Sequence, residues 1–367
     1  MIYRAIGLMS GSSLDGLDIA FVHFHEKGGN WIFDLEYADC VPYTPEWVNK
    51  LQSAVHLNAL EYQLLHAEYG HLTGEMVNAF IDKNNLHYQV QFIASHGHTT
   101  FHVPHKRMTA QLGDGAAIAA ETGIPVISNF RNLDVALRGQ GAPIVPIGDK
   151  LLFGHYAYCL NLGGIANLSA HHEGRYVSFD VCPANRVLNM LASRMNRDYD
   201  SGGQLASAGR INEALLEKLN RFPYYGLPYP KSLSNDFGNE TIFPLVTEEE
   251  PDINHALHTY CEHIAIQVRS AVERIEQDFN RSSQPVKMLV TGGGALNSYL
   301  VSRIQMLLEP HQVELEIPDE HIVQFKEALV MAFMGVLRWR EENNVLSSVT
   351  GATRNSIGGA IWMGHEV

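Results

Sequence analysis

Residues 7–18 hold the first cluster of side chains that could do chemistry, with the sequence Gly-Leu-Met-Ser-Gly-Ser-Ser-Leu-Asp-Gly-Leu-Asp. Glycine lets the backbone approach a ligand closely, and consecutive N–H groups in such a loop form a concavity that binds anions. The serine hydroxyls add donors for phosphate, and Asp15 and Asp18 could hold a hydrated Mg²⁺. Taken alone, the stretch is equally compatible with a surface turn whose acids face water.

Glycine clusters of this kind recur twice, each after an apolar run. Residues 162–167 read Leu-Gly-Gly-Ile-Ala-Asn, and residues 291–297 read Thr-Gly-Gly-Gly-Ala-Leu-Asn. The flanking apolar runs predict a strand–loop–strand hairpin around each of the first two clusters, and a strand that turns into a helix around the third. This order fits a duplicated nucleotide site, in which each half gives a hairpin to the phosphates and a helix N-terminus adds donors.

Missing motifs and composition argue against several other classes. The chain has no GxxxxGK[ST], no GxGxxG after its first strand and no GxSxG, so a P-loop, a Rossmann site and a nucleophile elbow are unsupported. A net charge of −14 with no basic run argues against nucleic-acid binding. No apolar run approaches the roughly 18 residues of a membrane span. No signal peptide and no CxxC pair is visible, so we expect a cytoplasmic protein that does not bind membranes.

The 367 residues suffice for two domains. Helical spacing of apolar residues predicts long helices over residues 58–84, 253–275 and 325–337. The glycine- and proline-rich residues 137–143 fit a crossing between domains. We therefore expect a first lobe over residues 1–138, with residues 346–367 packing back on it, and a second lobe over residues 139–345.

Residues 95–102 follow a compact apolar strand predicted at residues 90–94, and they include His96, His98 and His102. Polar residues directly after a buried strand lie where α/β sheets place their ligand sites. The stretch is therefore predicted to be a loop, either lining a polar pocket or facing solvent.

Taken together, the motifs resemble those of the anhydro-N-acetylmuramic acid kinase family, within the actin/hexokinase/Hsp70-like ATPase superfamily. Besides the three glycine clusters, the matching stretches are residues 95–97, 111–114, 130–131, 139–143, 179–180, 230–232, 326–328 and 349–352. The resemblance implies an α/β fold of two duplicated actin-like (ribonuclease H-like) lobes around a central cleft. It also implies ATP and Mg²⁺ as cofactors, an anhydro amino sugar as the other ligand, and a homodimer.

The family's reaction has two chemical requirements. Water and ATP convert 1,6-anhydro-N-acetylmuramic acid to N-acetylmuramic acid 6-phosphate and ADP, in the recycling of the cell wall. Opening the anhydro bridge requires a carboxylate that deprotonates water while the sugar gains oxocarbenium character. Transfer of the phosphoryl group to O6 mainly requires positioning, Mg²⁺ and donors around the phosphates.

The resemblance also implies roles for individual residues. Asp180 matches the family's catalytic aspartate, and it stands at the end of a predicted strand before a helix. A helix N-terminus would favour its ionised form, whether it serves as the base or merely caps the helix. The implied ATP contacts are Gly11, Ser12, Ser13, Leu14, Asp15, Gly16, Leu17, Asp18, Gly163, Gly164, Asn167, Gly292, Gly293 and Gly294, with Asp15 and Asp18 as metal ligands. The implied sugar contacts are Arg131, Glu327 and His96.

The chain departs from the family pattern around the expected sugar pocket. The usual Asp-Thr-Gly-Pro-Gly-Asn is Asp-Val-Cys-Pro-Ala-Asn at residues 180–185, so this turn must accept Cβ atoms. Asn129 and His98 replace the usual Asp and Gln, and Ser12 replaces a threonine. ATP binding therefore follows more directly than the identity of the sugar. A kinase for a different amino sugar and a non-catalytic nucleotide-binding sensor are the alternatives.

Overall fold

The computed structural model describes residues 1–11, 13–172, 174–280 and 284–364, which form two compact units. The first unit comprises Met1–Leu152 and Phe325–Val367, and the second comprises Phe153–Gln324. These limits differ from the expected boundaries after residues 138 and 345. Residues from Phe325 onward join the first unit because helix α13 (Glu320–Trp339) packs on its sheet.

The sheet of the first unit is built around a β-meander. β1, β2 and β3 pair antiparallel, β4 lies parallel to β1, and β6 lies parallel to β4. β12 and β5 add antiparallel partners to β6 and β4. The strands are β1 (Ile2–Ser10), β2 (Gly16–Lys27), β3 (Asn30–Pro42), β4 (Phe92–Val103), β5 (Met108–Leu112), β6 (Val126–Ser128) and β12 (Ala360–Trp362).

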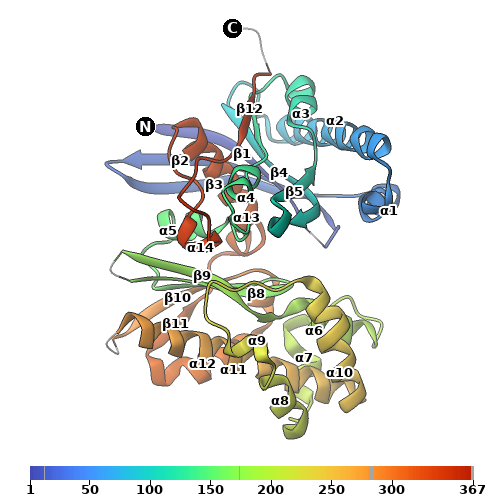
Figure 1. The fold of residues 1–367 in the computed structure, drawn as a ribbon, viewed down its shortest axis with the longest axis vertical. Helices are drawn as coiled ribbons and strands as arrows, with labels where there is room; N and C mark the ends of the chain where they lie inside the picture. The colour runs from blue at the N-terminus through green and yellow to red at the C-terminus, as the bar shows by residue number, and fades with distance from the viewer. Residues whose placement is uncertain (12, 173, 281–283, 365–367) are drawn as a thin grey trace. The chain divides into compact units, whose positions relative to one another are not determined.

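The sheet of the second unit repeats this topology (Figure 1). β7, β8 and β9 form an antiparallel meander, and β10 and β11 follow in parallel on the other side of β7. The strands are β7 (Tyr158–Leu162), β8 (Ile165–His172), β9 (Arg175–Pro183), β10 (Val286–Thr291) and β11 (Val313–Glu316). The predicted α/β class with two duplicated actin-like halves is confirmed by these two sheets.

Long helices cover the sheets. In the first unit, α2 (Ala59–Asn84) packs against Ile6 and Leu8 of β1, while α13 packs against the other face of that strand at Gly7. In the second unit, α11 (Ile253–Phe279) and α12 (Ser298–Leu308) cover one face (Figure 1). The remaining α-helices are α1 (Pro45–Ser53), α3 (Gly115–Thr122), α4 (Asn132–Ala136), α5 (Pro146–Leu151), α6 (Asn185–Ser193), α7 (Gln204–Ala208), α8 (Glu213–Asn220), α9 (Pro223–Gly226), α10 (Phe243–Glu249) and α14 (Ser347–Thr350).

The three long helices that the sequence predicts are present, with one difference in the neighbouring strand. Asn58 and Glu61 form a capping box that begins α2, as expected for an Asn followed three residues later by Glu. Residues 95–102, however, are not a loop. They continue β4, because β5 supplies antiparallel backbone partners from His98 to Val103.

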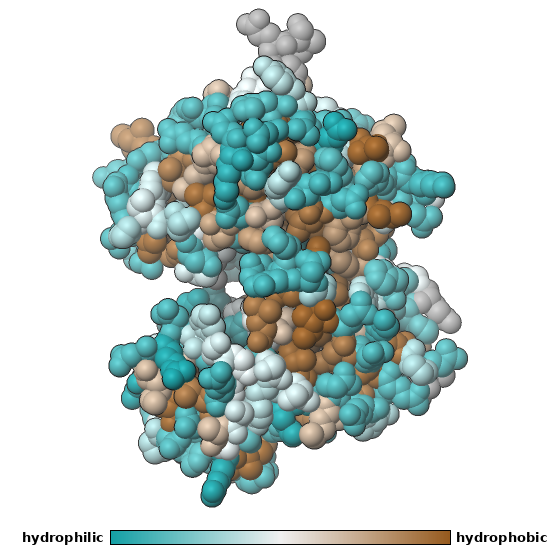
Figure 2. Space-filling view, turned by 180° about the vertical axis from the view of Figure 1, so that it is seen from behind, coloured by the Kyte–Doolittle hydropathy of each residue, from teal (hydrophilic) through white to brown (hydrophobic). Residues whose placement is uncertain are grey.

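The surface is largely hydrophilic. Figure 2 shows hydrophilic residues over much of the face in view of each unit, with hydrophobic residues gathered in patches among them. Among the described residues, no helix is long and apolar enough to cross a membrane.

The packing of α13 on β1 depends on Gly7. A Cβ at this position would lie 1.9 Å from the Ala328 carbonyl oxygen and 2.6 Å from the Ala332 nitrogen, both backbone atoms of α13. We predict that Gly7→Ala destabilises the protein by about 3 kcal/mol, because the helix must shift away from the sheet. The measurement is the free energy of unfolding in urea. Gly226→Ala is the control, because no atom lies within 4 Å of its added Cβ, and equal stability of the two variants would contradict the prediction.

Candidate active site

The loop between β1 and β2 is closed by the side chain of Asp15. Its Oδ1 accepts hydrogen bonds from the Ser13 hydroxyl at 2.6 Å and from the Gly16 N–H at 3.1 Å. Gly16 cannot be replaced without movement, because its Cβ would lie 2.5 Å from the Val41 carbonyl oxygen. Leu14 adopts a positive φ of 59°. The loop thus has a defined turn around an exposed carboxylate, and Ser12 lies outside the described residues.

Asp18 lies just beyond this loop, on β2, opposite Met9 on one side and Cys40 on the other. Burial raises the pKa of Asp18 to about 6, the Cys40 thiol hydrogen bond opposes this, and the charges of Asp15 and Glu327 add to it. A cation here would relieve the cost of three nearby carboxylates. Groups of three or more metal-ligating side chains are absent from the described residues. Mg²⁺ commonly uses only one or two carboxylates together with phosphate oxygens, so this pair of aspartates fits it.

Arg131 and His96 form a buried pair in the first unit. The Arg131 Nε donates to His96 Nε2 at 2.8 Å, and His96 Nδ1 lies 2.7 Å from the Gly97 carbonyl oxygen. Because a carbonyl only accepts, the proton is on Nδ1 and the imidazole is neutral. Burial lowers the pKa of His96 to about 3, and the Arg131 charge lowers it further. The Nδ1 hydrogen bond therefore fixes the ring to the backbone, and Nε2 fixes Arg131.

Glu327 belongs to the same group of charges. Burial raises its pKa, and the charges of Arg131 and Lys326 oppose that rise. The neighbouring Lys326 lies 2.6 Å from Asp149, and both side chains are 5% exposed. The start of α13 in the first unit thus places a partly buried carboxylate near the guanidinium of Arg131.

The glycine-rich residues 137–143 belong to the first unit, not to a crossing between units. Their loop is organised by Asp134, which accepts hydrogen bonds from the Gly141 N–H at 2.8 Å and the Thr350 hydroxyl at 2.7 Å. Gly139 is needed because its Cβ would lie 2.1 Å from Asp134 Oδ2. The Gly141 carbonyl in turn accepts from Arg131 Nη1 at 2.5 Å. The passage therefore supports Arg131.

The glycine clusters of the second unit meet one another. A Cβ on Gly292, which has a φ of 79°, would lie 2.8 Å from the Leu162 backbone, and one on Gly294 would lie 2.7 Å from the Leu162 Cβ. Gly164 and Gly293 are exposed. The β7–β8 hairpin and the turn after β10 therefore lie against each other, as a shared site for phosphates requires.

Asp180 stands in a row of polar side chains that crosses the second sheet. It pairs with Asn167 of β8, Asn167 pairs with Asn161 of β7, and Asn161 pairs with Thr291 of β10. Directly paired residues point to the same face, with Cβ atoms about 4.5–5.5 Å apart. The row lies on the face opposite α11, since the alternate residues of these strands belong to the core beneath that helix. Asn167 is therefore a neighbour of Asp180 as well as a member of the glycine loop.

Residues 224–233 hold Asp180 from the edge of β9. The Asp180 N–H donates to the Lys231 carbonyl at 3.1 Å, and its carbonyl accepts from the Tyr224 hydroxyl at 2.6 Å. The Leu233 N–H donates to carboxylate oxygen Oδ2 at 2.8 Å. Backbone and carboxylate are thus both fixed by one segment.

The expected effect of the α6 N-terminus on Asp180 is wrong. Asp180 lies within β9, and the first N–H groups of α6 donate to the carbonyls of Gly163 and Gly164 instead. The N-cap residue of α6 is Ala184, which makes no side-chain cap hydrogen bond, so Asp180 is not the N-cap of this helix. Burial raises the pKa of Asp180 to about 6, while the Leu233 hydrogen bond and the Lys231 charge oppose the rise. The carboxylate is still mostly ionised at neutral pH.

Several residues of these sites were not predicted. Cys40 bonds Asp18, Tyr224 and the Leu233 amide hold Asp180, and Asn185 Nδ2 donates to the Leu162 carbonyl at 2.8 Å. Of these residues, only Asn185 could have been picked out from the sequence, because it directly follows the Cys-Pro-Ala turn. The others depend on pairing between distant segments. Residues 180–185 all have negative φ, so the turn accepts the Cβ atoms of Cys182 and Ala184.

Comparison with known proteins bears directly on this arrangement. A family model described as anhydro-N-acetylmuramic acid kinase matches residues 3–364. The anhydro-N-acetylmuramic acid kinase of Hydrogenovibrio crunogenus is 33% identical over 377 residues, covering 97% of each chain. Those of Haemophilus influenzae and a Sulfurovum species are 32% and 30% identical, each covering at least 97% of both chains.

The duplicated sheets, with a glycine hairpin in each half and a partly buried carboxylate beside one of them, define a two-domain α/β protein whose halves share one topology. The sequence match extends over almost the whole chain and its relatives are matched over almost their whole length. The chain belongs to the anhydro-N-acetylmuramic acid kinase family.

The hydrogen bond from the Leu233 N–H to the Asp180 carboxylate can be tested by removing that N–H. We predict that Leu233→Pro raises the pKa of Asp180 by about one to two units, because a hydrogen bond to a charged group contributes about 1.5–3 kcal/mol. The measurement is a carbon-13 NMR titration of the aspartate carboxyls, assigned with Asp180→Asn. Leu233→Ala retains the amide and should leave the titration unchanged, so identical midpoints for Pro and Ala would refute this hold.

Proposed function

We propose that this protein is an ATP-dependent kinase that opens 1,6-anhydro-N-acetylmuramic acid with water and phosphorylates O6, giving N-acetylmuramic acid 6-phosphate and ADP. The observation that carries the proposal is Asp180, a partly buried carboxylate held by a backbone N–H and paired across the sheet with Asn167 of a glycine hairpin. Family membership supports the same reaction. A pKa near 6 leaves this group ionised at neutral pH yet basic enough to accept a proton.

The chemistry assigned to Asp180 is deprotonation of water. The Leu233 N–H engages Oδ2, and we assign the proton to Oδ1. As the water oxygen bonds to the anomeric carbon, the bond from that carbon to O6 breaks and its electron pair goes to O6. O6 then attacks the γ-phosphorus of ATP, and ADP leaves.

The glycine clusters are the proposed phosphate donors. In the first unit these are Gly11, Ser13 and the other described residues of the first loop. In the second unit they are Gly163, Gly164 and the triple glycine at 292–294. Gly164 and Gly293 are exposed within their turns, and consecutive backbone N–H groups in such turns are suited to bind anions. Asp18, together with Asp15, would hold Mg²⁺, which when bound neutralises charge on the phosphates.

The sugar is assigned to Arg131 and Glu327. A guanidinium offers several donors in a fixed plane, which suits it to oxygen-rich ligands. Arg131 donates hydrogen bonds from Nε to His96 and from Nη1 to the Gly141 carbonyl. The protein therefore fixes its orientation before any sugar binds. Of the three implied sugar contacts, His96 is thus reassigned to positioning Arg131. The turn at residues 182–184, with Cys and Ala in place of the usual glycines, favours a related amino sugar as the second candidate substrate.

The cellular setting follows from the same proposal. All four cysteines are free thiols, three of them buried and Cys40 partly buried, which suits a reducing compartment such as the cytoplasm. A homodimer remains a prediction from the family resemblance.

Loss of the base should abolish the reaction but not the binding of nucleotide. We predict that Asp180→Asn lowers kcat by about 10²–10⁴-fold, the usual contribution of a general base. ATP affinity should change little, because no phosphate contact is assigned to this side chain. The measurements are sugar phosphate and ADP formed from the anhydro sugar, and nucleotide affinity by calorimetry.

The same assay separates the competing functions. A wild-type protein that acts only on another sugar in a panel of anhydro and ordinary amino sugars would replace the substrate. ATP binding with slow hydrolysis that no sugar stimulates would instead point to a sensor. Full activity in Asp180→Asn would remove Asp180 from the mechanism.

His96 should influence sugar binding through Arg131. We predict that His96→Ala raises KM for the sugar about tenfold, a loss of about 1.4 kcal/mol of binding, with a smaller change in kcat. The KM for ATP should not change. His105→Ala, at an exposed histidine of the same unit, is the control, and an unaltered sugar KM in His96→Ala would count against the positioning role.

A further inference from the structure

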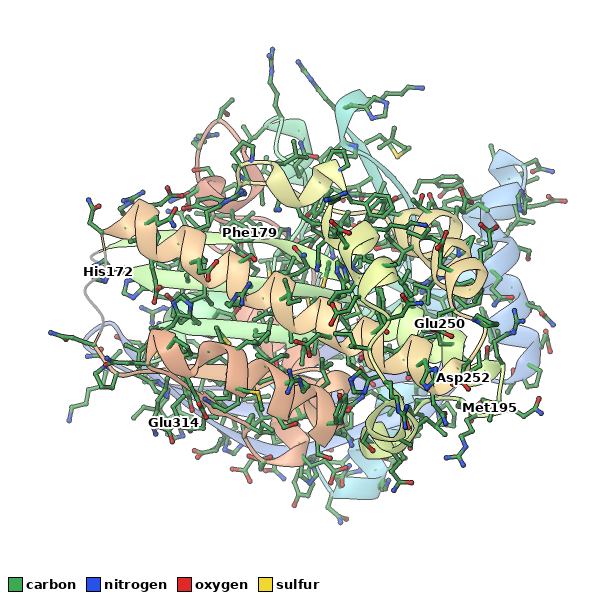
Figure 3. All side chains as sticks on the ribbon, turned by 90° about the horizontal axis from the view of Figure 1, so that it is seen from below. His172, Phe179, Met195, Glu250, Asp252 and Glu314 are labelled. Carbon is green, nitrogen blue, oxygen red and sulfur yellow. The ribbon has the colours of Figure 1, made fainter. Side chains whose placement is uncertain are left out.

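A pocket lies on the opposite side of β9 from the Asp180 carboxylate. It is lined by Phe179 and Val181 of β9, by Tyr225 and Lys231, and by Gln267, Ser270, Ala271 and Arg274 of α11. Phe179, labelled in Figure 3, is on the face of the sheet that α11 covers. None of the glycine clusters contributes to this pocket, so it is distinct from the proposed phosphate donors.

The pocket contains two cations whose hydrogen bonds go to neutral groups. Lys231 Nζ donates to the carbonyls of Tyr224 and Tyr225 at 3.2 and 3.4 Å, and lies 4.5 Å from the Tyr224 ring centre. Arg274 donates to the carbonyls of Gly226, at 3.3 Å, and of Leu227. Within the described ranges, neither cation has a carboxylate at salt-bridge distance. Carbonyls satisfy the donors without supplying a charge, so Lys231 is balanced in part by Asp180 and Cys182 of β9 and not by a hydrogen-bonded carboxylate.

Holding two like charges in one partly buried pocket has a measurable consequence. Burial lowers the pKa of Lys231 to about 8, the charge of Arg274 lowers it further, and Cys182 and Asp180 of β9 oppose the change. On α9, Lys231 faces the neutral carbonyls of Tyr224 and Tyr225 and the ring of Tyr224, whose hydroxyl is engaged by the Asp180 carbonyl. An anion between the two cations would remove this repulsion.

We propose that this pocket binds a small oxyanion of the phosphate class, either inorganic phosphate or a phosphate monoester, between Lys231 and Arg274. Lys231 and Arg274 retain N–H donors beyond those used on the carbonyls, and Ser270 adds a neutral hydroxyl at the same wall. Charge-assisted hydrogen bonds of this kind are about twice as strong as neutral ones. The site stands on its own geometry and does not require the proposed kinase reaction.

Binding of an anion in this pocket would change the pKa of Asp180. The Lys231 carbonyl accepts the Asp180 N–H, and the Lys231 charge is one of the two influences that hold the pKa of Asp180 down. An anion that neutralises Lys231 therefore raises the pKa of Asp180. Phosphate bound at the glycine loops, beside Asn167, would also raise this pKa, but that rise would persist in Arg274→Gln, whereas a rise caused by this pocket would not.

The test is calorimetric titration of inorganic phosphate into the nucleotide-free protein at pH 7. Wild type should show saturable millimolar binding, and Lys231→Gln and Arg274→Gln should each weaken it about tenfold, since a charge-assisted hydrogen bond contributes at least about 1.4 kcal/mol. Lys231→Arg keeps the charge and should keep most of the affinity. Lys287→Gln, at a surface lysine of the same unit paired with Glu316, should bind like wild type.

The pH dependence provides a second check. Wild-type affinity should fall as pH rises through about 8, where Lys231 loses its proton, and Lys231→Gln should not show this fall. Phosphate should also raise the NMR midpoint of Asp180 in wild type and not in Arg274→Gln. Absence of saturable binding, or equal binding by wild type and both glutamine variants, would overturn the proposal, whatever the kinase assay gives.

Discussion

The register of the antiparallel hairpins decides on which face of the second sheet the polar side chains of β7, β8 and β9 lie. Pairing of Asn161 with Asn167, and of Asn167 with Asp180, puts three polar side chains on one face, while Leu160, Leu168 and Phe179 fill the core on the other. A slip of one residue would turn Asp180 into the core under α11 and leave Phe179 outside. Burial of the apolar face thus fixes the chemical face, and the candidate base is positioned by the hydrophobic core without being part of it.

Three carboxylates, two in the first unit and one in the second, have pKa values that burial raises above the ordinary range. Burial raises the pKa values of Asp18 and Asp180 to about 6 and also raises that of Glu327. In each case a specific partner opposes burial: the Cys40 thiol, the Leu233 amide and Lys231, and Arg131 with Lys326. Desolvation makes a carboxylate more basic, and a hydrogen bond or nearby cation keeps it ionised. This balance suits groups that accept protons or bind cations near neutral pH.

Much of the architecture could be predicted from the sequence, because it is encoded locally. Apolar periodicity gave the long helices, glycine clusters marked both hairpins, and Asn58 with Glu61 marked the start of α2. Features that depend on distant pairing could not be read in this way. Residues 95–102 look like a loop until β5 supplies their partners, and the division between the units at Phe325 depends on α13 returning to pack on Gly7. The ionisation of Asp180 was predicted from the helix that follows it in sequence. Its pKa depends instead on burial, which raises it, and on the Leu233 amide, which opposes the rise.

The duplicated topology explains why the two units carry different chemistry at corresponding places. Asp18 occupies in the first sheet the place that Asn167 occupies in the second, one pair before the end of the hairpin, and Cys40 then corresponds to Asp180. In the first unit α13 covers this face and brings Glu327 toward Asp18, which favours a cation. In the second unit the edge strand is bordered by residues 224–233, which supply an amide and a lysine to a single carboxylate. The same backbone thus places one carboxylate beside other acids and the other beside an amide and a lysine, because the segments added to each sheet differ.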